Sequence, residues 1–296
     1  MERITPHLWF DNQAKEAGAL YTSVFPDSRI KNTTVLHNTP SGSVDIVTIE
    51  LGGQEFTLLS AGPLFRFNPS ISFLVACERK EEVDQLWAKL SEGGTPLMEI
   101  GSYPFSERYG WLQDRYGLSW QLMHAGGGRE IGQKITPVMM FVGKQSGRAE
   151  EAIRCYTSVF RDSGAGDMNR YGAGEEPDRE GTIRFGRFTL ESEQFAAMDS
   201  AGPHDFAFNE AVSLMVHCDT QQDVDELWDK LLAGGGTPTQ CGWLKDRFGL
   251  SWQVIPDVLP KLLAHPDREK AGRAMHAMMQ MVKIDGPALQ RAFDGA

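Results

Sequence analysis

The first sixty residues alternate apolar and polar positions in an order that predicts one strand, one helix and three more strands. Residues 13–25 form the expected helix, which Pro26 ends. Its apolar positions recur near helical spacing at Ala14, Ala17, Tyr21, Val24 and Phe25. The expected strands, separated by Gly- and Pro-containing turns, are 4–10, 29–37, 43–51 and 55–60. This order is a β-α-β-β-β module.

A second module of the same kind follows. Residues 81–91 are expected to form a helix that ends before two glycines, because its apolar positions lie at i, i+3, i+4 and i+7: Val83, Leu86, Trp87 and Leu90. The expected strands are 70–77, 110–112 and 119–123, with one more near 98–109. The turn between the last two strands contains Asp114 and Arg115, and we interpret it as structural.

The whole pattern is then repeated, which indicates an internal duplication. The most similar blocks are Gly110–Gln121 and Gly242–Gln253, in which ten of twelve positions are identical. Tyr21–Phe25 recurs unchanged as Tyr156–Phe160. The first copy contains about ten additional residues around 98–109, which we expect to lengthen a hairpin or loop.

The repeat divides the chain into four parts. Residues 1–124 and 132–255 are expected to be two similar α+β domains, each of paired β-α-β-β-β modules around its own cup-shaped hollow. The Gly-rich stretch 125–131 is expected to link them. Residues 256–296 have no counterpart between the copies, and they predict C-terminal helices over 259–263 and 267–283.

Composition and charge exclude several classes of protein. The net charge of −11 argues against a nucleic-acid partner, because such proteins usually present a basic surface. The sequence has no signal-peptide core and no run near the ~18 apolar residues that span a bilayer, so we expect a cytoplasmic protein without membrane contact. The four cysteines form no CxxC pair, which fits a reducing compartment.

Several motifs resemble the vicinal oxygen chelate (glyoxalase/bleomycin-resistance/dioxygenase) superfamily. Within it, the chain is most similar to the PhnB-like branch, whose members are often labelled 3-demethylubiquinone-9 3-methyltransferase. The matching stretches are Thr136-Pro137, Tyr156–Phe160, Gly202-Pro203, Phe208–Glu210, Cys241–Gln253 and Ala277–Asp285. The resemblance covers nearly the whole chain and implies tandem glyoxalase-like units whose strands curl around a hollow that receives a small molecule.

Alternation along the strands predicts which residues face the hollows. Thr5, His7 and Trp9 share one face of the first strand, and Gln121 and Gln253 lie at matched positions of the last strands. Met140 and Ser213 are placed on the same faces in the second copy. The resemblance implies that metal-using relatives hold the ion with His or Glu at such positions. Since His7 is the one coordinating residue among them, we expect no metal and no cofactor.

The expected ligand-binding residues are Trp9, Gln121, Met140, Ser213 and Gln253. Each glutamine could instead tie its hairpin to a neighbouring strand. His7 could line the pocket or act as a general base. Cys241 is a candidate nucleophile with His204 as its base, and it stands where the first copy has Tyr109.

The sequence leaves the activity open between three hypotheses. The first is an enzyme, or former enzyme, that binds or transforms a small metabolite in a cup without a tightly held metal. The second is a non-catalytic protein of the bleomycin-resistance type that sequesters a small molecule, and the third is a structural protein whose cups are filled by its own side chains. Methyl transfer, as the family label implies, would require a GxGxxG loop after a strand if the cofactor site were of the Rossmann type, and the sequence has none.

The duplication also bears on assembly. One chain with two copies can replace a homodimer of single units, so we expect a monomeric pseudo-dimer or a homodimer. The tail carries an apolar stripe at Met275, Met278, Met279 and Val282, which must be covered by the second copy or across a dimer.

Overall fold

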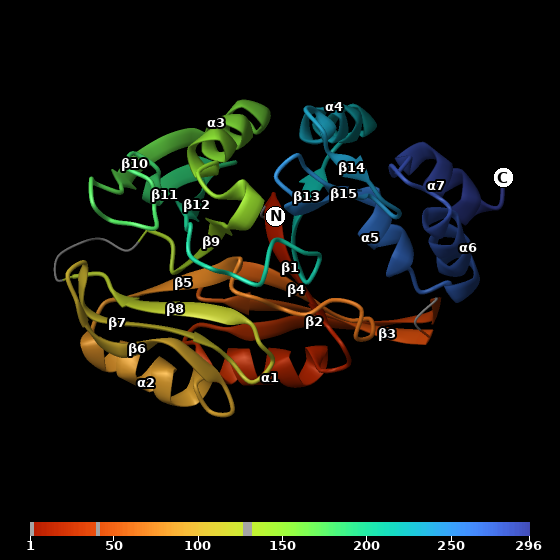
Figure 1. Cartoon of the computed structure of the whole chain (residues 1–296). Coiled ribbons are helices and arrows are strands. Elements are labelled where there is room, and N and C mark those ends of the chain that lie inside the picture. The colour runs from red at the N-terminus through yellow and green to blue at the C-terminus, as the bar shows by residue number, and fades with distance from the viewer. Residues whose placement is uncertain (1–2, 40–41, 127–131) are drawn as a thin grey trace. The chain divides into compact units, whose positions relative to one another are not determined.

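The computed structural model in Figure 1 describes residues 3–39, 42–126 and 132–296, and most of the expected linker lies outside them. Internal contacts divide the chain into two compact units. Unit 1 comprises Met1–His7 and Ser213–Ala296, and unit 2 comprises Leu8–Val212. The boundary falls within strand β1 (Ile4–Phe10). The α+β class predicted from the sequence is confirmed.

In unit 2, the first module contains the expected helix and a long antiparallel ribbon. Helix α1 (Ala14–Val24) buries one apolar face against β3 and β4. The strands pair in the order β4-β3-β2, and their bounds are β2 Arg29–Thr39, β3 Gly42–Leu51 and β4 Gln54–Ser60. Both β2 and β3 exceed their expected lengths, because their pairing continues as far as Thr39 and Gly42.

The other strands of unit 2 form an eight-stranded sheet in the order β10-β11-β12-β9-β5-β8-β7-β6. Their bounds are β5 Ile71–Cys77, β6 Thr95–Tyr103, β7 Ser106–Gln113, β8 Ser119–His124, β9 Ile135–Phe141, β10 Gly164–Arg170, β11 Ile183–Leu190 and β12 Glu193–Asp199. The two copies meet where β5 pairs antiparallel with β9. This sheet therefore joins the second module of the first copy to the first module of the second copy, which differs from the expectation that each copy encloses its own cup.

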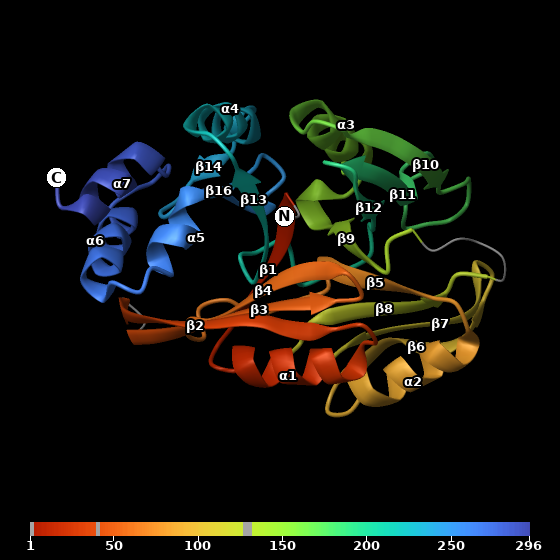
Figure 2. The ribbon, with the colours of Figure 1, turned by 180° about the vertical axis from the view of Figure 1, so that it is seen from behind.

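Two helices cover the outer face of this sheet. Figures 1 and 2 show α2 (Lys80–Leu90) along β6–β8 and α3 (Ala149–Val159) along β10–β12, with the strands between them. A short 3₁₀ turn, Gly143–Gln145, precedes α3. Glycines allow close approach of both helices: a Cβ on Gly110 would lie 2.5 Å from Trp87, and one on Gly186 would lie 3.0 Å from Ile153. Residues that alternate with these glycines, such as Trp111 and Arg187, consequently lie on the opposite, inner face.

The additional residues of the first copy form a hairpin. Strands β6 and β7 pair over Thr95–Tyr103 and Ser106–Gln113, whereas the second copy retains only β14 (Thr237–Pro238) and β15 (Trp243–Lys245) at the matched place. The strand expected near 98–109 is thus present. It is made of the end of β6 and the beginning of β7, which pair with each other.

Unit 1 contains the second module of the second copy. Its strands pair in the order β14-β15-β16-β13, with β13 at Val212–Cys218 and β16 at Ser251–Pro256. Helix α4 (Gln221–Leu232) packs on β15 and β16. The helix begins with a capping box in which Thr220 accepts from the Asp223 N–H, and the Asp223 carboxylate accepts from the Thr220 N–H.

The tail forms three helices in place of the two expected: α5 (Val258–Leu263), α6 (Arg268–Met279) and α7 (Gly286–Asp294). They pack on the second copy, since their cluster includes Ile255 of β16 and Met215 of β13. The expected methionine stripe is only partly right. Met278 joins this cluster, but Val282 lies beyond the end of α6 and is 48% exposed.

The Asp-Arg turns have the structural role expected of them. Asp114 is buried and accepts hydrogen bonds from the backbone N–H groups of Tyr116 and Leu118, from Trp120 Nε1 and from the Tyr21 hydroxyl. Asp246 accepts three matching bonds in unit 1 from Phe248, Leu250 and Trp252. Every helix in the described part of the chain is too short or too polar to cross a lipid bilayer.

Candidate functional site

The inner face of the eight-stranded sheet in unit 2 has a polar row at its centre. Gln121 Nε2 on β8 donates to Ser72 Oγ on β5 at 2.8 Å, and the Tyr109 hydroxyl on β7 donates to Gln121 Oε1 at 2.8 Å. Trp111 Nε1 donates to Ser119 Oγ at 2.8 Å. The protein itself therefore bonds both ends of the Gln121 amide and the hydroxyl of Ser119.

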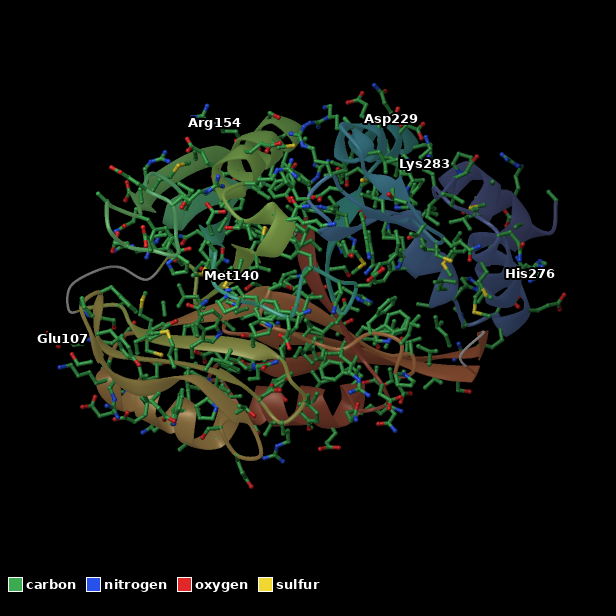
Figure 3. All side chains as sticks on the ribbon, viewed as in Figure 1. Glu107, Met140, Arg154, Asp229, His276 and Lys283 are labelled. Atoms are coloured by element: carbon green, nitrogen blue, oxygen red, sulfur yellow. The ribbon has the colours of Figure 1, made fainter. Side chains whose placement is uncertain are left out.

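Apolar side chains surround this polar row. Leu74, Tyr109, Val138 and Ala196 form a buried cluster on the same face. Partly buried side chains that pack against the cluster are Met98, Tyr103, Trp111, Met123, Phe185 and Met198. Met140 is 4% exposed, and Figure 3 shows it between β9–β12 and β5–β8. Methionines and aromatic rings give this face an adaptable apolar lining around the polar row.

The inner face of unit 1 carries the matched residues of the second copy. Gln253 Nε2 donates to Ser213 Oγ at 2.9 Å, the same bond that Gln121 makes to Ser72. Trp243 lies opposite Gln253 in the β15–β16 pairing, so its side chain is on this face as well. Each amide therefore ties its strand to a neighbouring strand.

His7 lies on this inner face of unit 1 and is 5% exposed. Its ring contacts the edge of Trp243 with centroids 5.4 Å apart, and no group of the described protein bonds its Nδ1. Burial lowers the pKa of His7 to about 4, against a smaller opposing effect of its backbone hydrogen bond. The imidazole is consequently neutral at pH 7, and it is a weak proton acceptor.

Cys241 stands next to β15 with a left-handed φ of 59° and is half-buried. Its N–H donates to the Met281 carbonyl of the tail at 2.8 Å. Burial raises the pKa of its thiol, so the nucleophilic thiolate is disfavoured. His204, its predicted base, belongs to unit 2, where Nε2 lies 2.7 Å from Ser200 Oγ.

Trp9 makes a local contact in unit 2. Its indole N–H donates to the Gly62 carbonyl at 2.8 Å, and its ring contacts Phe65 edge to face. Both contacts hold the loop after β4. The side chain therefore already has a partner for its one polar atom.

The residues on these faces do not fit a metal ion. Gln253 and Ser213 are neutral groups bonded to each other, and the His7 ring beside them contacts Trp243. Across residues 3–39, 42–126 and 132–296, no three His, Cys, Asp or Glu side chains gather closely enough to hold an ion. The donor set implied by metal-using relatives is thus not provided by the residues described here.

The alternation that identified Gln121 and Gln253 also places Ser72 and Ser251 on the inner faces. Two inner-face residues were missed in the sequence: Tyr109, which stands at the position matched to Cys241, and Trp243, which lies opposite Gln253. Strand alternation applied to both copies together could have found both.

Comparison with known proteins gives a family and a fold. The family described as 3-demethylubiquinone-9 3-methyltransferase matches residues 2–123 and again residues 133–255. The PhnB protein of Bacillus cereus is 41% identical over 42% of this chain and 100% of its own, with a TM-score of 0.40. Glyoxalase I of Zea mays is 10% identical, with a TM-score of 0.58 over 89% of this chain and 98% of its own. That likeness confirms the glyoxalase-like fold expected from the sequence.

One curated relative matches a shorter stretch. The carboxy-S-adenosyl-L-methionine synthase of Psychrobacter arcticus is 28% identical over 109 residues. The match covers 36% of this chain and 40% of that protein, so this chain spans well under half of the relative's length.

Proposed function

We propose that this chain, which belongs to the 3-demethylubiquinone-9 3-methyltransferase family, binds a small molecule on the inner faces of its sheets without a metal ion and without covalent chemistry. One observation carries the proposal. At the matched positions of both copies, a neutral amide is bonded to a neutral serine, Gln121 to Ser72 and Gln253 to Ser213. Such groups orient a ligand by hydrogen bonds but do not transfer protons.

The titratable groups on these faces support binding rather than catalysis. A general base works best with a pKa near the working pH, and burial lowers the pKa of His7 to about 4. A nucleophilic cysteine needs a lowered pKa, and burial raises that of Cys241. Burial also raises the pKa of the Tyr109 hydroxyl, which is bonded to Gln121.

The test is ligand-induced thermal stabilisation of the full chain. We expect small metabolites to raise the Tm, since a ligand that binds only the folded state stabilises it by mass action. Gln121→Leu and Gln253→Leu are matched variants, one in each unit, and at least one should lose the shift. A ligand whose shift survives both substitutions would contradict binding at the inner faces.

Catalysis is the second candidate, because His7 and Cys241 stand on or beside the inner face of unit 1. It requires that substrate binding alter their pKa values. Turnover of any bound metabolite that is abolished by His7→Ala or Cys241→Ala, with binding retained, would replace the binding proposal with an enzymatic one.

Methyl transfer is the activity named by the family description. A Rossmann-type cofactor site needs a continuous parallel sheet, whereas in the described strands parallel pairs such as β5–β8 alternate with antiparallel ones. Equilibrium dialysis with labelled S-adenosylmethionine tests this activity directly. We expect no retention of label by the full chain, and saturable retention would favour the methyltransferase.

A further inference from the structure

The duplication supplies an internal comparison of the two inner faces. In unit 2, the Tyr109 hydroxyl donates to Gln121 Oε1, and Trp111 Nε1 donates to Ser119 Oγ. Among the described residues of unit 1, the matched atoms have no such partners: Ser251 Oγ is buried without a hydrogen bond, and no donor reaches Gln253 Oε1. At the same positions, the protein's own side chains bond these atoms in unit 2, and no described group bonds them in unit 1.

Two substitutions between the copies explain the difference. Cys241 replaces Tyr109, and a thiol is too short and too weak a donor to take the place of the phenol. His7 replaces Val138 and contacts the ring of Trp243, whereas the matched Trp111 bonds Ser119. Histidine also adds a buried Nδ1 that no described group bonds.

An unpaired buried polar atom is unfavourable, so several such atoms at one place call for an outside partner. His7 is 5% exposed, and Ser251 is fully buried. Ser213, which pairs with Gln253, is fully buried beside them. The unsatisfied atoms therefore belong to a built, rigid part of the sheet rather than to mobile surface side chains.

We propose that His7, Ser251 and Gln253 form a site in unit 1 for one small uncharged molecule that carries both a hydrogen-bond donor and an acceptor, such as a primary amide or an alcohol. This inference rests on the proposed function and deepens it. Gln253 Oε1 requires a donor from the ligand, and the Ser251 hydroxyl can give or accept a bond. The matched face of unit 2 does not bind such a molecule, because Tyr109 and Trp111 already occupy its polar atoms.

The burial that keeps His7 neutral disfavours a charged ligand in the same way, since an ion loses its hydration on entering. Lys245 pairs with Ser251 in the β15–β16 register and lies on the same face, so it is the group that could attract an anion. An anionic probe therefore belongs in the test.

The probe is acetamide, compared with acetate of the same shape, added to the full chain and followed by NMR of the histidine and glutamine side chains. We expect acetamide to shift the His7 and Gln253 signals with saturation and to leave those of Gln121 unchanged. Gln253→Leu and Ser251→Ala should each weaken the acetamide shift of His7 at least tenfold, whereas Gln121→Leu should not.

Each other outcome is decisive. The assignment would be overturned if acetate bound as tightly as acetamide. It would also be overturned if Gln121→Leu weakened the acetamide shift of His7 as much as Gln253→Leu does. No saturable acetamide shift at any tested concentration would also overturn it, while the broader binding proposal would stand if other metabolites still raised the Tm. If Gln253→Leu does not fold, Ser251→Ala alone decides the result.

Discussion

Asp114 shows how one buried side chain can fix a turn, a strand and a helix together. Its carboxylate receives four donors, among them the Tyr21 hydroxyl at 2.7 Å. Burial raises its pKa, and the four hydrogen bonds oppose that effect. The sequence predicted this role, because Asp before a Gly-containing turn bonds its own backbone. It could not show Tyr21 as a partner, which lies far away in the chain.

Replacing Tyr21 with phenylalanine should destabilise the protein by about 1–3 kcal/mol, because it leaves a buried carboxylate without one donor. Urea unfolding measures this loss. Tyr116→Phe is the control, since its hydroxyl bonds Glu16 at an exposed site and should contribute less than about 1 kcal/mol. Equal losses in the two variants would contradict the structural role assigned to the buried pair.

His7 should make the protein sensitive to acid. Its pKa is about 4 in the folded protein and 6.5 in the reference state, so the unfolded chain binds more protons between these values. Stability contributed by neutral His7 is therefore present above pH 6.5 and is lost as the pH falls toward 4. We expect His7→Val to lose about 2 kcal/mol less than the wild type between pH 7 and pH 5. Parallel stability curves for the two proteins would show that His7 titrates normally.

Among the helices and strands, the two copies differ most at one end of the inner face. The first copy extends β6 and β7 into a hairpin there, and the second copy has the tail, whose Met281 and Val282 carbonyls accept from Cys241 and Gly242. The extra length of the first copy was visible in the sequence as unmatched residues. The third tail helix, α7, was not predicted from the sequence. The pattern over α6 also did not indicate that this helix turns its alanines inward.

Leu289 of α7 tests whether the tail is an integral part of unit 1. It is fully buried in the cluster with Ile255 and Phe293, so Leu289→Ala should cost about 2–5 kcal/mol in urea unfolding. Met275→Ala on the partly exposed side of α6 should cost less than about 1 kcal/mol. A loss below 1 kcal/mol for Leu289→Ala would mean that the tail is dispensable.

For the chain as a whole, the duplication governs the fold. The sequence predicted the order of the modules, since each copy repeats the same strands and helices. It could not predict that β5 of the first copy pairs with β9 of the second, because the edge strands of similar modules carry similar patterns and any of them could pair. Register between modules depends on packing over long distances in the chain.

A matched pair of asparagines joins the copies within unit 2. Asn68 Nδ2 donates to the Ala207 carbonyl at 3.0 Å, and Asn209 Nδ2 donates to the Arg66 carbonyl at 2.9 Å. Asn68→Ala and Asn209→Ala should each reduce the free energy of unfolding by about 1 kcal/mol. Asn12→Ala, at an exposed position near the end of β1, should change it by less than about 0.5 kcal/mol. Unequal losses of unfolding free energy in Asn68→Ala and Asn209→Ala would contradict the equivalence of the two loops that contain these asparagines.

The assembly expected from the duplication, a monomeric pseudo-dimer or a homodimer, stays a prediction. Sedimentation equilibrium of the full chain distinguishes the two states by mass.

Titration of the His7 imidazole by ¹⁵N NMR between pH 3 and pH 8 examines the inner face of unit 1 most directly. If this face is buried and uncharged, the pKa of His7 should lie at about 4. The ring should then be neutral throughout the physiological pH range. A midpoint at or above the ordinary 6.5 would mean that water or a carboxylate reaches the ring, and the assignment of this face to an uncharged ligand would then be wrong.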